Sequence, residues 1–341
     1  MKQDIKEFSL EELANFLSDN NFKRFYADEV FRWIYKKRIE DFFKMTNISK
    51  DGQVFLDKNF YFSSISLIKR EISKDKTEKF LFGLNDKEAI ETVLIRERDR
   101  LTLCVSSQVG CKFNCKFCTS GKSGFKRNLS VSEIVNQYLA TEKIIYPEKI
   151  TNIVFMGIGE PLDNFSNVLK AINIFINPKG IYLGRKKICI STCGIIPKIK
   201  ELIDLNLDVK LSVSLHSPFQ DIRSQIMPIN KKYQLKELIE VSREFSNKKK
   251  LPITFEYILI SNLNTRKEDA KELAFLLKNI NYKINLIFYN DDFSNSFKAP
   301  SQGEVKNFTD ELKKRNIFYT LRKPKGKDIN AACGQLRAIF S

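Results

Sequence analysis

The sequence predicts an α/β protein: a partial (βα)6 barrel preceded by a small helical N-terminal domain and a β-meander extension. Three observations lead to this fold class. Residues 1–60 place apolar side chains at helical spacing. Residues 61–96 contain short apolar runs separated by polar turn clusters, which is typical of antiparallel strands. Residues 97–341 alternate strand-like runs with helical patterns, which indicates βαβ units and a parallel sheet.

The N-terminal domain carries two helical patterns. Ser9 and Glu12 form a capping box ahead of the first apolar stripe. A second stripe over residues 27–38 includes Trp33. The simplest interpretation of these aromatic residues is a small helical core, and contact of this basic region with RNA is the alternative.

The strands and helices of the other two domains follow in order along the chain. The predicted meander strands are 65–72, 79–84, 89–95 and 101–107. The last of these also begins the barrel, whose further strands are predicted at 150–157, 186–192, 209–216, 252–260 and 283–290. Helices are predicted between them at 131–145, 164–176, 196–205, 235–246 and 266–280. A last helix near 304–315 precedes a strand at 317–322, and six barrel strands favour an open barrel over a full eight-stranded one.

Composition restricts the class of protein. The chain has 341 residues, and its 43% hydrophobic content is enough for a sizeable core. No run approaches the roughly 18 apolar residues of a membrane helix, and the start lacks the apolar region of a signal peptide. Seven cysteines without an export signal fit a reducing cytosol. The formal charge of +17 favours a polyanionic partner such as nucleic acid, although a lysine-rich composition from a biased genome is the alternative.

Cys111, Cys115 and Cys118 lie in one short loop at spacings of four and three residues. Three thiolates this close can hold three corners of a cubane iron–sulfur cluster and leave one iron open for a ligand. A zinc site is the alternative, but it needs a fourth ligand, and the only histidine, His216, is distant in sequence. The pattern resembles the radical S-adenosylmethionine (SAM) superfamily, which implies one [4Fe-4S] cluster whose open iron binds SAM.

Polar residues follow five of the predicted barrel strands, at the rim where such barrels place their active sites. Each alone has an ordinary structural explanation, such as a turn or a helix cap, but their joint position predicts a SAM site. Glu160, after Gly159, offers a carboxylate for the SAM ammonium. Ser191, Ser214 and Asn290 offer neutral hydrogen-bonding groups, and His216 can do the same, although a lone histidine is more often structural. Leu215, between Ser214 and His216, completes the predicted cofactor-binding set.

Longer segments narrow the resemblance. They include ETV at 91–93, CVSSQVG at 104–110, MGIGEPL at 156–162, SLHSP at 214–218 and DINAACGQL at 328–336. With the cysteine loop, these segments resemble the RlmN/Cfr family of radical SAM RNA adenine methyltransferases over nearly the whole chain. The resemblance implies methylation of adenine C2 in 23S rRNA and in tRNA. The alternative is the Cfr-type reaction at adenine C8, which Pro161 after Glu160 disfavours because Cfr tends to have alanine there.

The resemblance also gives roles to three residues that the sequence alone would not single out. It implies that Cys333 is methylated by one SAM, that the radical from a second SAM activates this methyl group, and that the resulting methylene adds to adenine. Cys104 matches the cysteine that forms a disulfide with Cys333 and releases the RNA, and Glu91 matches the proton acceptor. Without the resemblance, Cys104 would be a core residue, Glu91 a strand carboxylate, and Cys333 a loop cysteine.

The resemblance further implies an electron donor such as flavodoxin or ferredoxin, and a cytoplasmic monomer without a membrane segment. Lys122, Lys126 and Arg127 flank the cysteine loop and belong to several basic runs that are candidates for phosphate contacts. Cys189 and Cys193 match no family role, and we expect them to be structural. Two rivals remain open: a radical SAM enzyme acting on a protein or metabolite, and a non-catalytic RNA-binding module with a zinc or cluster site.

Overall fold

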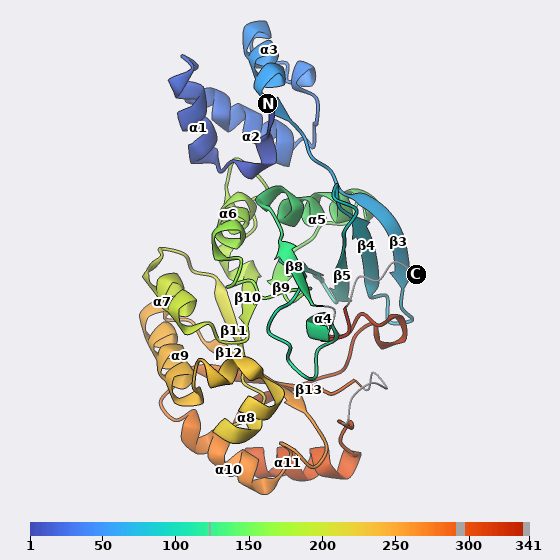
Figure 1. Ribbon diagram of the computed structural model, residues 1–341, viewed down its shortest axis with the longest axis vertical. Coiled ribbons are helices and arrows are strands. Elements are labelled where there is room, and N and C mark those ends of the chain that lie inside the picture. The colour runs from blue at the N-terminus through green and yellow to red at the C-terminus, as the bar shows by residue number, and fades with distance from the viewer. Residues whose placement is uncertain (123, 291–296, 337–341) are drawn as a thin grey trace.

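A single curved sheet of ten strands organises most of the molecule in the computed structural model (Figure 1), which describes residues 1–122, 124–290 and 297–336. The strand order is β14-β13-β12-β11-β10-β9-β6-β5-β4-β3. All neighbours from β14 to β6 pair in parallel, and those from β6 to β3 pair antiparallel. The predicted α/β class with a partial barrel is therefore confirmed.

The N-terminal helices form a separate lobe at the top of Figure 1. The Ser9 capping box is present as predicted and begins the first helix. Phe16 and Phe60 pack edge to face, so aromatic residues do form the core of this lobe. Its elements are β1 (Gln3–Asp4), a 3-10 turn (Ile5–Glu7), α1 (Leu10–Asp19), α2 (Phe25–Tyr35), a 3-10 turn (Phe42–Lys44), α3 (Lys50–Asn59) and β2 (Phe60–Tyr61).

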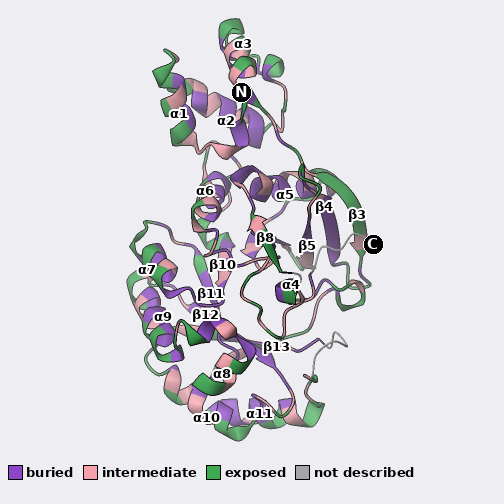
Figure 2. Ribbon diagram, in the orientation of Figure 1, coloured by how far each residue is buried: buried purple, intermediate pink, exposed green. Residues whose placement is uncertain are grey.

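The meander consists of β3 (Ser66–Ile72), β4 (Glu78–Gly83) and β5 (Ala89–Glu97), which pair antiparallel with one another. Figure 2 shows β3 as a largely exposed edge strand, whereas β4 is buried. β5 also pairs with β6 (Arg100–Cys104), the first strand of the barrel. The meander and the barrel therefore share one sheet, and the division at residue 96 stays a prediction about domains.

The barrel alternates strands and helices as predicted. Its parallel strands after β6 are β9 (Asn152–Phe155), β10 (Ile188–Thr192), β11 (Lys210–Ser214), β12 (Ile253–Leu259), β13 (Tyr282–Phe288) and β14 (Tyr319–Arg322). The helices on the outer side of the sheet are α5 (Val131–Ile144), α6 (Phe165–Ile176), α7 (Ile196–Asp204), α9 (Leu235–Lys249), α10 (Lys267–Leu276) and α11 (Gln302–Lys314) (Figure 1). The predicted last strand, β14, pairs with β13 and extends the parallel part of the sheet.

Short elements at the open side of the barrel frame the cysteine loop. β7 (Gln108–Gly110) and β8 (Phe125–Asn128) form an antiparallel hairpin around this loop, and α4 (Thr119–Lys122) lies within it. α8 (Gln220–Ile226) follows β11. The remaining 3-10 turns are Arg185–Lys187, Pro228–Lys231 and Lys327–Ile329.

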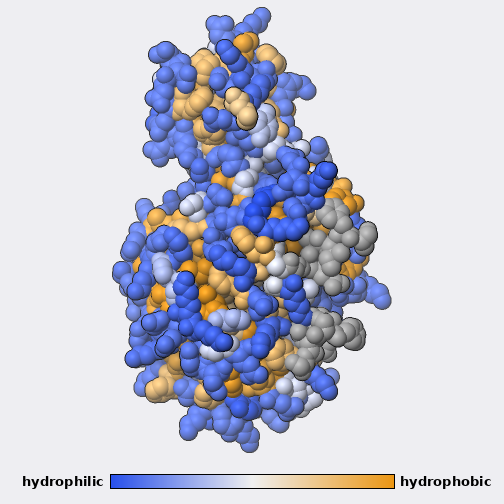
Figure 3. Space-filling view, in the orientation of Figure 1, coloured by the Kyte–Doolittle hydropathy of each residue, from blue (hydrophilic) through white to orange (hydrophobic). Residues whose placement is uncertain are grey.

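The visible face of the molecule is mostly hydrophilic, and a narrow neck joins the N-terminal lobe to the larger lower lobe (Figure 3). Among the described residues, none of the helices has the length and apolar character needed to cross a membrane.

Candidate functional site

Backbone hydrogen bonds fix the cysteine loop at three places. The Cys111 N–H donates to the Gly124 carbonyl at 2.8 Å, next to the β7–β8 hairpin. The Lys116 N–H donates to the Ile226 carbonyl at the end of α8, at 2.9 Å. The Thr119 N–H donates to the Gly334 carbonyl of the C-terminal segment, at 2.7 Å. The loop is thus held between its own hairpin, α8 and the segment that carries Cys333.

Gly110 makes the tight closure of this loop possible. Its φ of +76° lies in the left-handed region, and a Cβ there would lie 1.9 Å from the Gly124 carbonyl oxygen. Any side chain at this position would open the base of the loop.

The three cysteines of the loop line one cavity together. Burial raises the pKa of the Cys111 thiol to about 12 and raises that of Cys115 as well, and the neighbouring cysteines add to both shifts. Iron would reverse this shift, because a metal-bound cysteine is deprotonated. In the part of the chain that the structure describes, no three His, Cys, Asp or Glu side chains converge on a single ion. A cubane cluster places each cysteine on a different iron, so the cysteine set fits a cluster better than a single zinc ion.

Glu160 is held at the carboxyl end of β9 by backbone donors. One carboxylate oxygen accepts from the Cys193 N–H at 2.7 Å, and the other accepts from the Leu162 N–H at 3.0 Å. Burial raises the pKa of this carboxyl group, and these hydrogen bonds oppose the rise. The preceding Gly159 has a φ of +101° and packs against Gln108, so the turn that presents Glu160 requires glycine.

The predicted polar residues of β10 and β11 reach the same cavity. Ser191, Ser214 and His216 line it, whereas Leu215 is fully buried and donates its N–H to the Glu256 carbonyl at 3.0 Å. The Nδ1 of His216 accepts a hydrogen bond from the Ile258 N–H at 3.0 Å. Burial, helped by the nearby Arg223 charge, lowers the pKa of His216 to about 3, so the ring is neutral at physiological pH.

Cys333 lies on the C-terminal segment next to the start of α4, where the Gly334 carbonyl accepts from the Thr119 N–H. Its side chain is exposed and lines the cavity with the three loop cysteines. The Ser120 hydroxyl donates to the Leu336 carbonyl at 2.6 Å, which fixes the segment on the far side of Cys333.

Cys104 and Glu91 are not among the residues that line the cavity. Cys104 ends β6 and packs in a small apolar cluster with Ala331 and Leu336, on either side of Cys333 in sequence. Burial, followed by the charge of Cys333, raises the pKa of the Cys104 thiol to about 12. Glu91 is buried on the adjacent strand β5, and its carbonyl accepts from the Ser106 hydroxyl at 2.6 Å. Cys104 and Cys333 are both free thiols in the structure.

Asn290, the remaining predicted cofactor residue, follows β13 and is buried. Its Oδ1 finds no hydrogen-bond partner among the described residues. The residues directly after it, 291–296, lie outside the described part of the chain.

The cavity itself has a volume of about 160 Å³ and opens between the cysteine loop and the carboxyl ends of the parallel strands. It brings together side chains from segments that are far apart in sequence. The predicted site residues that line it are Cys111, Cys115, Cys118, Gly159, Glu160, Ser191, Ser214, His216 and Cys333.

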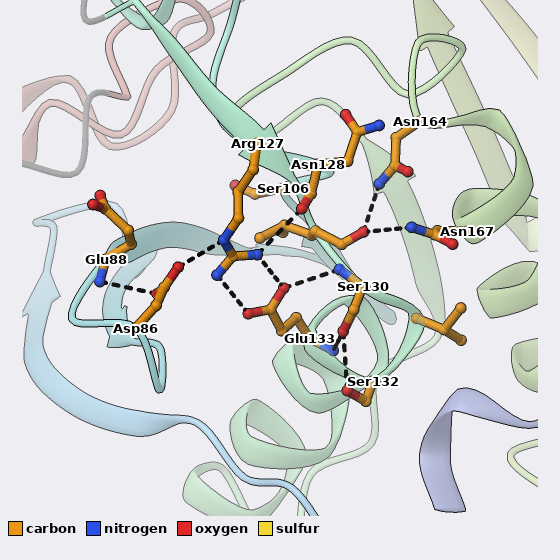
Figure 4. A network of polar contacts seen from close by, with 12 residues as sticks. Asp86, Glu88, Ser106, Arg127, Asn128, Ser130, Ser132, Glu133, Asn164 and Asn167 are labelled. Atoms are coloured by element: carbon orange, nitrogen blue, oxygen red, sulfur yellow. Dashed lines mark hydrogen bonds and ion pairs between the residues drawn. The ribbon is translucent and has the colours of Figure 1, made fainter. Parts of the chain in front are cut away.

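Lys126 and Arg127, beside the cysteine loop, form ion pairs within the protein. Figure 4 shows the guanidinium of Arg127 between Asp86 and Glu133, with shortest distances of 2.7 Å to each carboxylate. Lys126 lies 2.7 Å from Glu88. These pairs connect β8 to the meander turn and to α5, so their first role is structural.

Three buried polar residues contribute to the site without having been predicted. Gln108 accepts from the Glu160 N–H at 2.9 Å, and Arg223 donates to the carbonyls of Cys193 and Ser214 at 2.8 and 3.0 Å. Glu256, in the middle of β12, lines the cavity. Charged residues within a strand or short helix give no sequence signal that distinguishes a buried position from an exposed one.

Comparison with known proteins agrees with this geometry. A profile of the radical SAM superfamily matches residues 105–277, and a profile described as a ribosomal RNA large subunit methyltransferase N-terminal domain matches residues 3–61. A dual-specificity RNA methyltransferase RlmN from Nautilia profundicola is 42% identical, over 98% of each chain. A probable RlmN from Clostridium botulinum is 43% identical, over 99% of each chain. The crystal structure of a radical SAM methyltransferase from Sphaerobacter thermophilus superposes with a TM-score of 0.91 at 36% identity, and covers 99% of this chain and 100% of its own.

Proposed function

Because this chain belongs to the RlmN family of radical SAM methyltransferases, we propose that it methylates C2 of an adenine in 23S rRNA and in tRNA. The observation that carries the proposal is the cavity that joins the three-cysteine loop, Glu160 and Cys333. A cofactor bound by the cysteine loop and Glu160 would lie next to Cys333, which is able to carry the transferred carbon. Radical chemistry is needed because adenine C2 is an electron-poor carbon that an electrophilic methyl group does not attack.

The cofactor set follows from the residues that line the cavity. Cys111, Cys115 and Cys118 would hold a [4Fe-4S] cluster, and Glu160 would receive the SAM ammonium. Ser191 and Ser214 would bind neutral polar groups of SAM. When bound, the cluster supplies the electron that cleaves SAM and so provides the radical chemistry. An electron donor such as flavodoxin or ferredoxin would be required.

Cys333 would carry the new carbon. Its sulfur would take a methyl group from one SAM, and the radical chemistry of a second SAM would remove a hydrogen atom from that methyl group. The carbon on Cys333 would then bond to C2 of the adenine, with loss of the C2 proton and of one electron, which the oxidised cluster would accept, so that RNA and protein are covalently joined. Because Cys333 is exposed and lines the cavity, an unstacked base can reach it.

Cys104 and Glu91 would release the RNA. The sulfur of Cys104 attacks that of Cys333; an S–S bond forms, and the bond from the Cys333 sulfur to the RNA-linked carbon breaks. That carbon is protonated to give the methyl group, and Glu91 accepts the proton lost from C2. The contact of Cys104 with Ala331 and Leu336 supports this pairing. With its pKa near 12, Cys104 is a thiol at neutral pH, so the attack requires loss of its proton.

Methylation at adenine C8 is the second candidate within the same family. Pro161 favours C2, since it follows Glu160 in the RlmN pattern. Mass spectrometry of nucleosides from RNA treated with the enzyme separates 2-methyladenosine from 8-methyladenosine.

The decisive experiment replaces Cys104 with alanine in a cell that supplies the cluster and RNA. The proposal expects RNA to bond to Cys333 and to remain there, so a Cys333 peptide carrying a nucleotide should be found by mass spectrometry. Cys189→Ala is the matched control, because this cysteine lies within β10 and has no proposed role. Absence of the adduct, with wild-type enzyme still methylating RNA, would exclude Cys104 as the releasing thiol. If the wild-type enzyme also fails on RNA, a protein or metabolite substrate becomes the better hypothesis.

A further inference from the structure

Glu256 is a buried carboxylate that the proposed reaction does not yet use. It lies on β12 between neighbours on both adjacent strands and is only 4% exposed. Its Oε1 accepts from the Ser212 hydroxyl of β11 at 2.6 Å and from the Asn285 amide of β13 at 2.9 Å. Two donors therefore fix the orientation of the carboxylate group.

The second oxygen of Glu256 is in a different situation. Oε2 is buried and has no hydrogen-bond partner among the described residues. Within the same part of the chain, no Lys or Arg lies in ion-pair contact with Glu256. A buried acceptor without a donor costs free energy, and the cost is larger when the group is charged. Such a group is costly to keep unless something binds it.

The cavity supplies the place for that missing donor. Glu256 lines it together with Ser214, which is its register partner on β11, and with Cys333. A carboxylate accepts hydrogen bonds and cannot donate them, so the free oxygen selects for a hydroxyl or amino group. Both adenine nucleosides of the proposed reaction, SAM and the target adenosine, carry such groups. Carboxylates also bind ribose hydroxyls in nucleotide-binding folds.

We propose that the free oxygen of Glu256 accepts a hydrogen bond from an adenosine bound in this cavity, and so is a nucleoside-binding residue of the enzyme. The inference rests on the proposed function and deepens it. The shared chemistry is a neutral donor on an adenosine. Its two possible sources are a ribose hydroxyl of SAM and the 6-amino group of the target adenine.

The test begins with Glu256→Gln in the cluster-loaded enzyme. Glutamine keeps the shape of the side chain and leaves an oxygen for Ser212 and Asn285, but it replaces the free acceptor with a donor. Binding of S-adenosylhomocysteine is measured by anaerobic calorimetry, and binding of an RNA that the wild type methylates is measured separately. Loss of this hydrogen bond should weaken one ligand by roughly 10- to 100-fold. Glu142→Gln is the control, since Glu142 is equally buried but accepts from Tyr138 outside the cavity.

Changes on the ligand identify the source, and their first readout uses the wild-type enzyme, so it does not depend on whether the variant folds. With wild-type enzyme, 2′-deoxy or 3′-deoxy S-adenosylhomocysteine should bind more weakly if the ribose is the donor, and this loss should disappear in Glu256→Gln. RNA in which purine replaces the target adenine lacks the 6-amino group. If that amino group is the donor, this RNA should bind the wild type more weakly, and the loss should disappear in Glu256→Gln. If neither affinity changes in Glu256→Gln, the free oxygen holds only water and the inference is wrong. Methylation of RNA by the wild type is scored independently, so failure of the proposed function would be recognised separately.

Discussion

The Nζ of Lys79 lies 3.2 Å from the Oε1 of Glu91. The two side chains come from the neighbouring strands β4 and β5, and only 10% and 9% of their surfaces are exposed. Lys79 also lies 3.3 Å from the Oε2 of Glu71, so its ammonium joins a partly exposed carboxylate to a buried one. In the proposed reaction Glu91 takes up a proton, and Lys79 supplies the positive charge that a buried carboxylate needs nearby.

Lys79→Met should therefore affect both folding and release of RNA. Removing one partner of a buried ion pair leaves the other charge uncompensated, which lowers the free energy of unfolding by roughly 3 kcal/mol. Because Glu91 then loses its orienting partner, the RNA adduct on Cys333 should persist longer than in the wild type. Quantitative mass spectrometry of the Cys333 peptide over time measures this lifetime.

Two variants distinguish positioning of Glu91 from general destabilisation. Lys79→Arg keeps the charge and should restore release. Lys69→Met removes a lysine that is 56% exposed and pairs with Glu71, and it should change stability by less than about 1 kcal/mol. Normal adduct lifetime in a folded Lys79→Met protein would show that Lys79 does not act on Glu91.

His216 should make the protein sensitive to acid. Its pKa is about 3 in the folded state, against an ordinary value near 6.5, because the ring is buried and lies near Arg223. Below pH 6.5, His216 therefore binds a proton in the unfolded chain but not in the folded protein. Stability from this group is fully present above pH 6.5 and falls by about 1.4 kcal/mol per unit as the pH drops toward 3.

His216→Asn checks this dependence. The Asn Oδ1 can replace Nδ1 as the acceptor for the Ile258 N–H, and asparagine tolerates the positive φ of 59° at this position. Since the chain has a single histidine, the difference between the two urea-unfolding curves should isolate this group. Equal loss of stability between pH 6.5 and 4 in both proteins would contradict the assignment.

Gly159→Ala should displace Glu160. The new Cβ would lie 2.5 Å from the Cβ of Gln108 at a φ of +101°, so the turn must move or strain. We expect a loss of at least about 1 kcal/mol of stability and weaker binding of S-adenosylhomocysteine. Gly303→Ala in α11 is the control, because its nearest neighbour is 3.9 Å away and alanine favours a helix. Unchanged binding in Gly159→Ala would remove Glu160 from the predicted cofactor site.

The fold was predictable because its signal is local and repeated. Strand and helix periodicities along the barrel, and capping boxes such as Ser9 with Glu12, are contained in short stretches of sequence. The cysteine loop was equally recognisable in the sequence, since its three cysteines lie within eight residues. The hairpin that frames it was not predicted, because β7 and β8 are short and acquire their strand geometry only by pairing with each other.

The polar interior of the site was harder to predict from the sequence, because it depends on contacts between distant segments. Arg223 and Glu256 are charged residues whose burial depends on partners from other strands and loops. No local pattern encodes such a partner. Cys104 and Glu91 were proposed as site residues only through the family resemblance, and in the structure Cys104 shares an apolar cluster with residues of the segment that bears Cys333. Long-range packing thus carries the information that the single sequence lacks.

Lys231 and Lys232 are expected to contact RNA more directly than Lys126 and Arg127. They follow α8, whose last residue accepts the backbone hydrogen bond from the cysteine loop, and both side chains are exposed. Neither is ion-paired with a residue in the described ranges, and Lys232 lies 5.4 Å from the ring of Tyr233.

Replacing both lysines with glutamine should weaken RNA binding to a similar extent for any sequence, because phosphate contacts carry no base information. The slope of log affinity against log salt should fall by about one for each lysine that contacts a phosphate. Filter binding at several salt concentrations measures both effects. Arg127→Gln should instead reduce stability, since it removes the ion-pair partner of Asp86 and of the partly buried Glu133. Lys306→Gln, on α11 and paired with Asp310 at 2.8 Å, should change neither quantity. An unchanged salt slope in the double variant would place the RNA path on another face of the barrel.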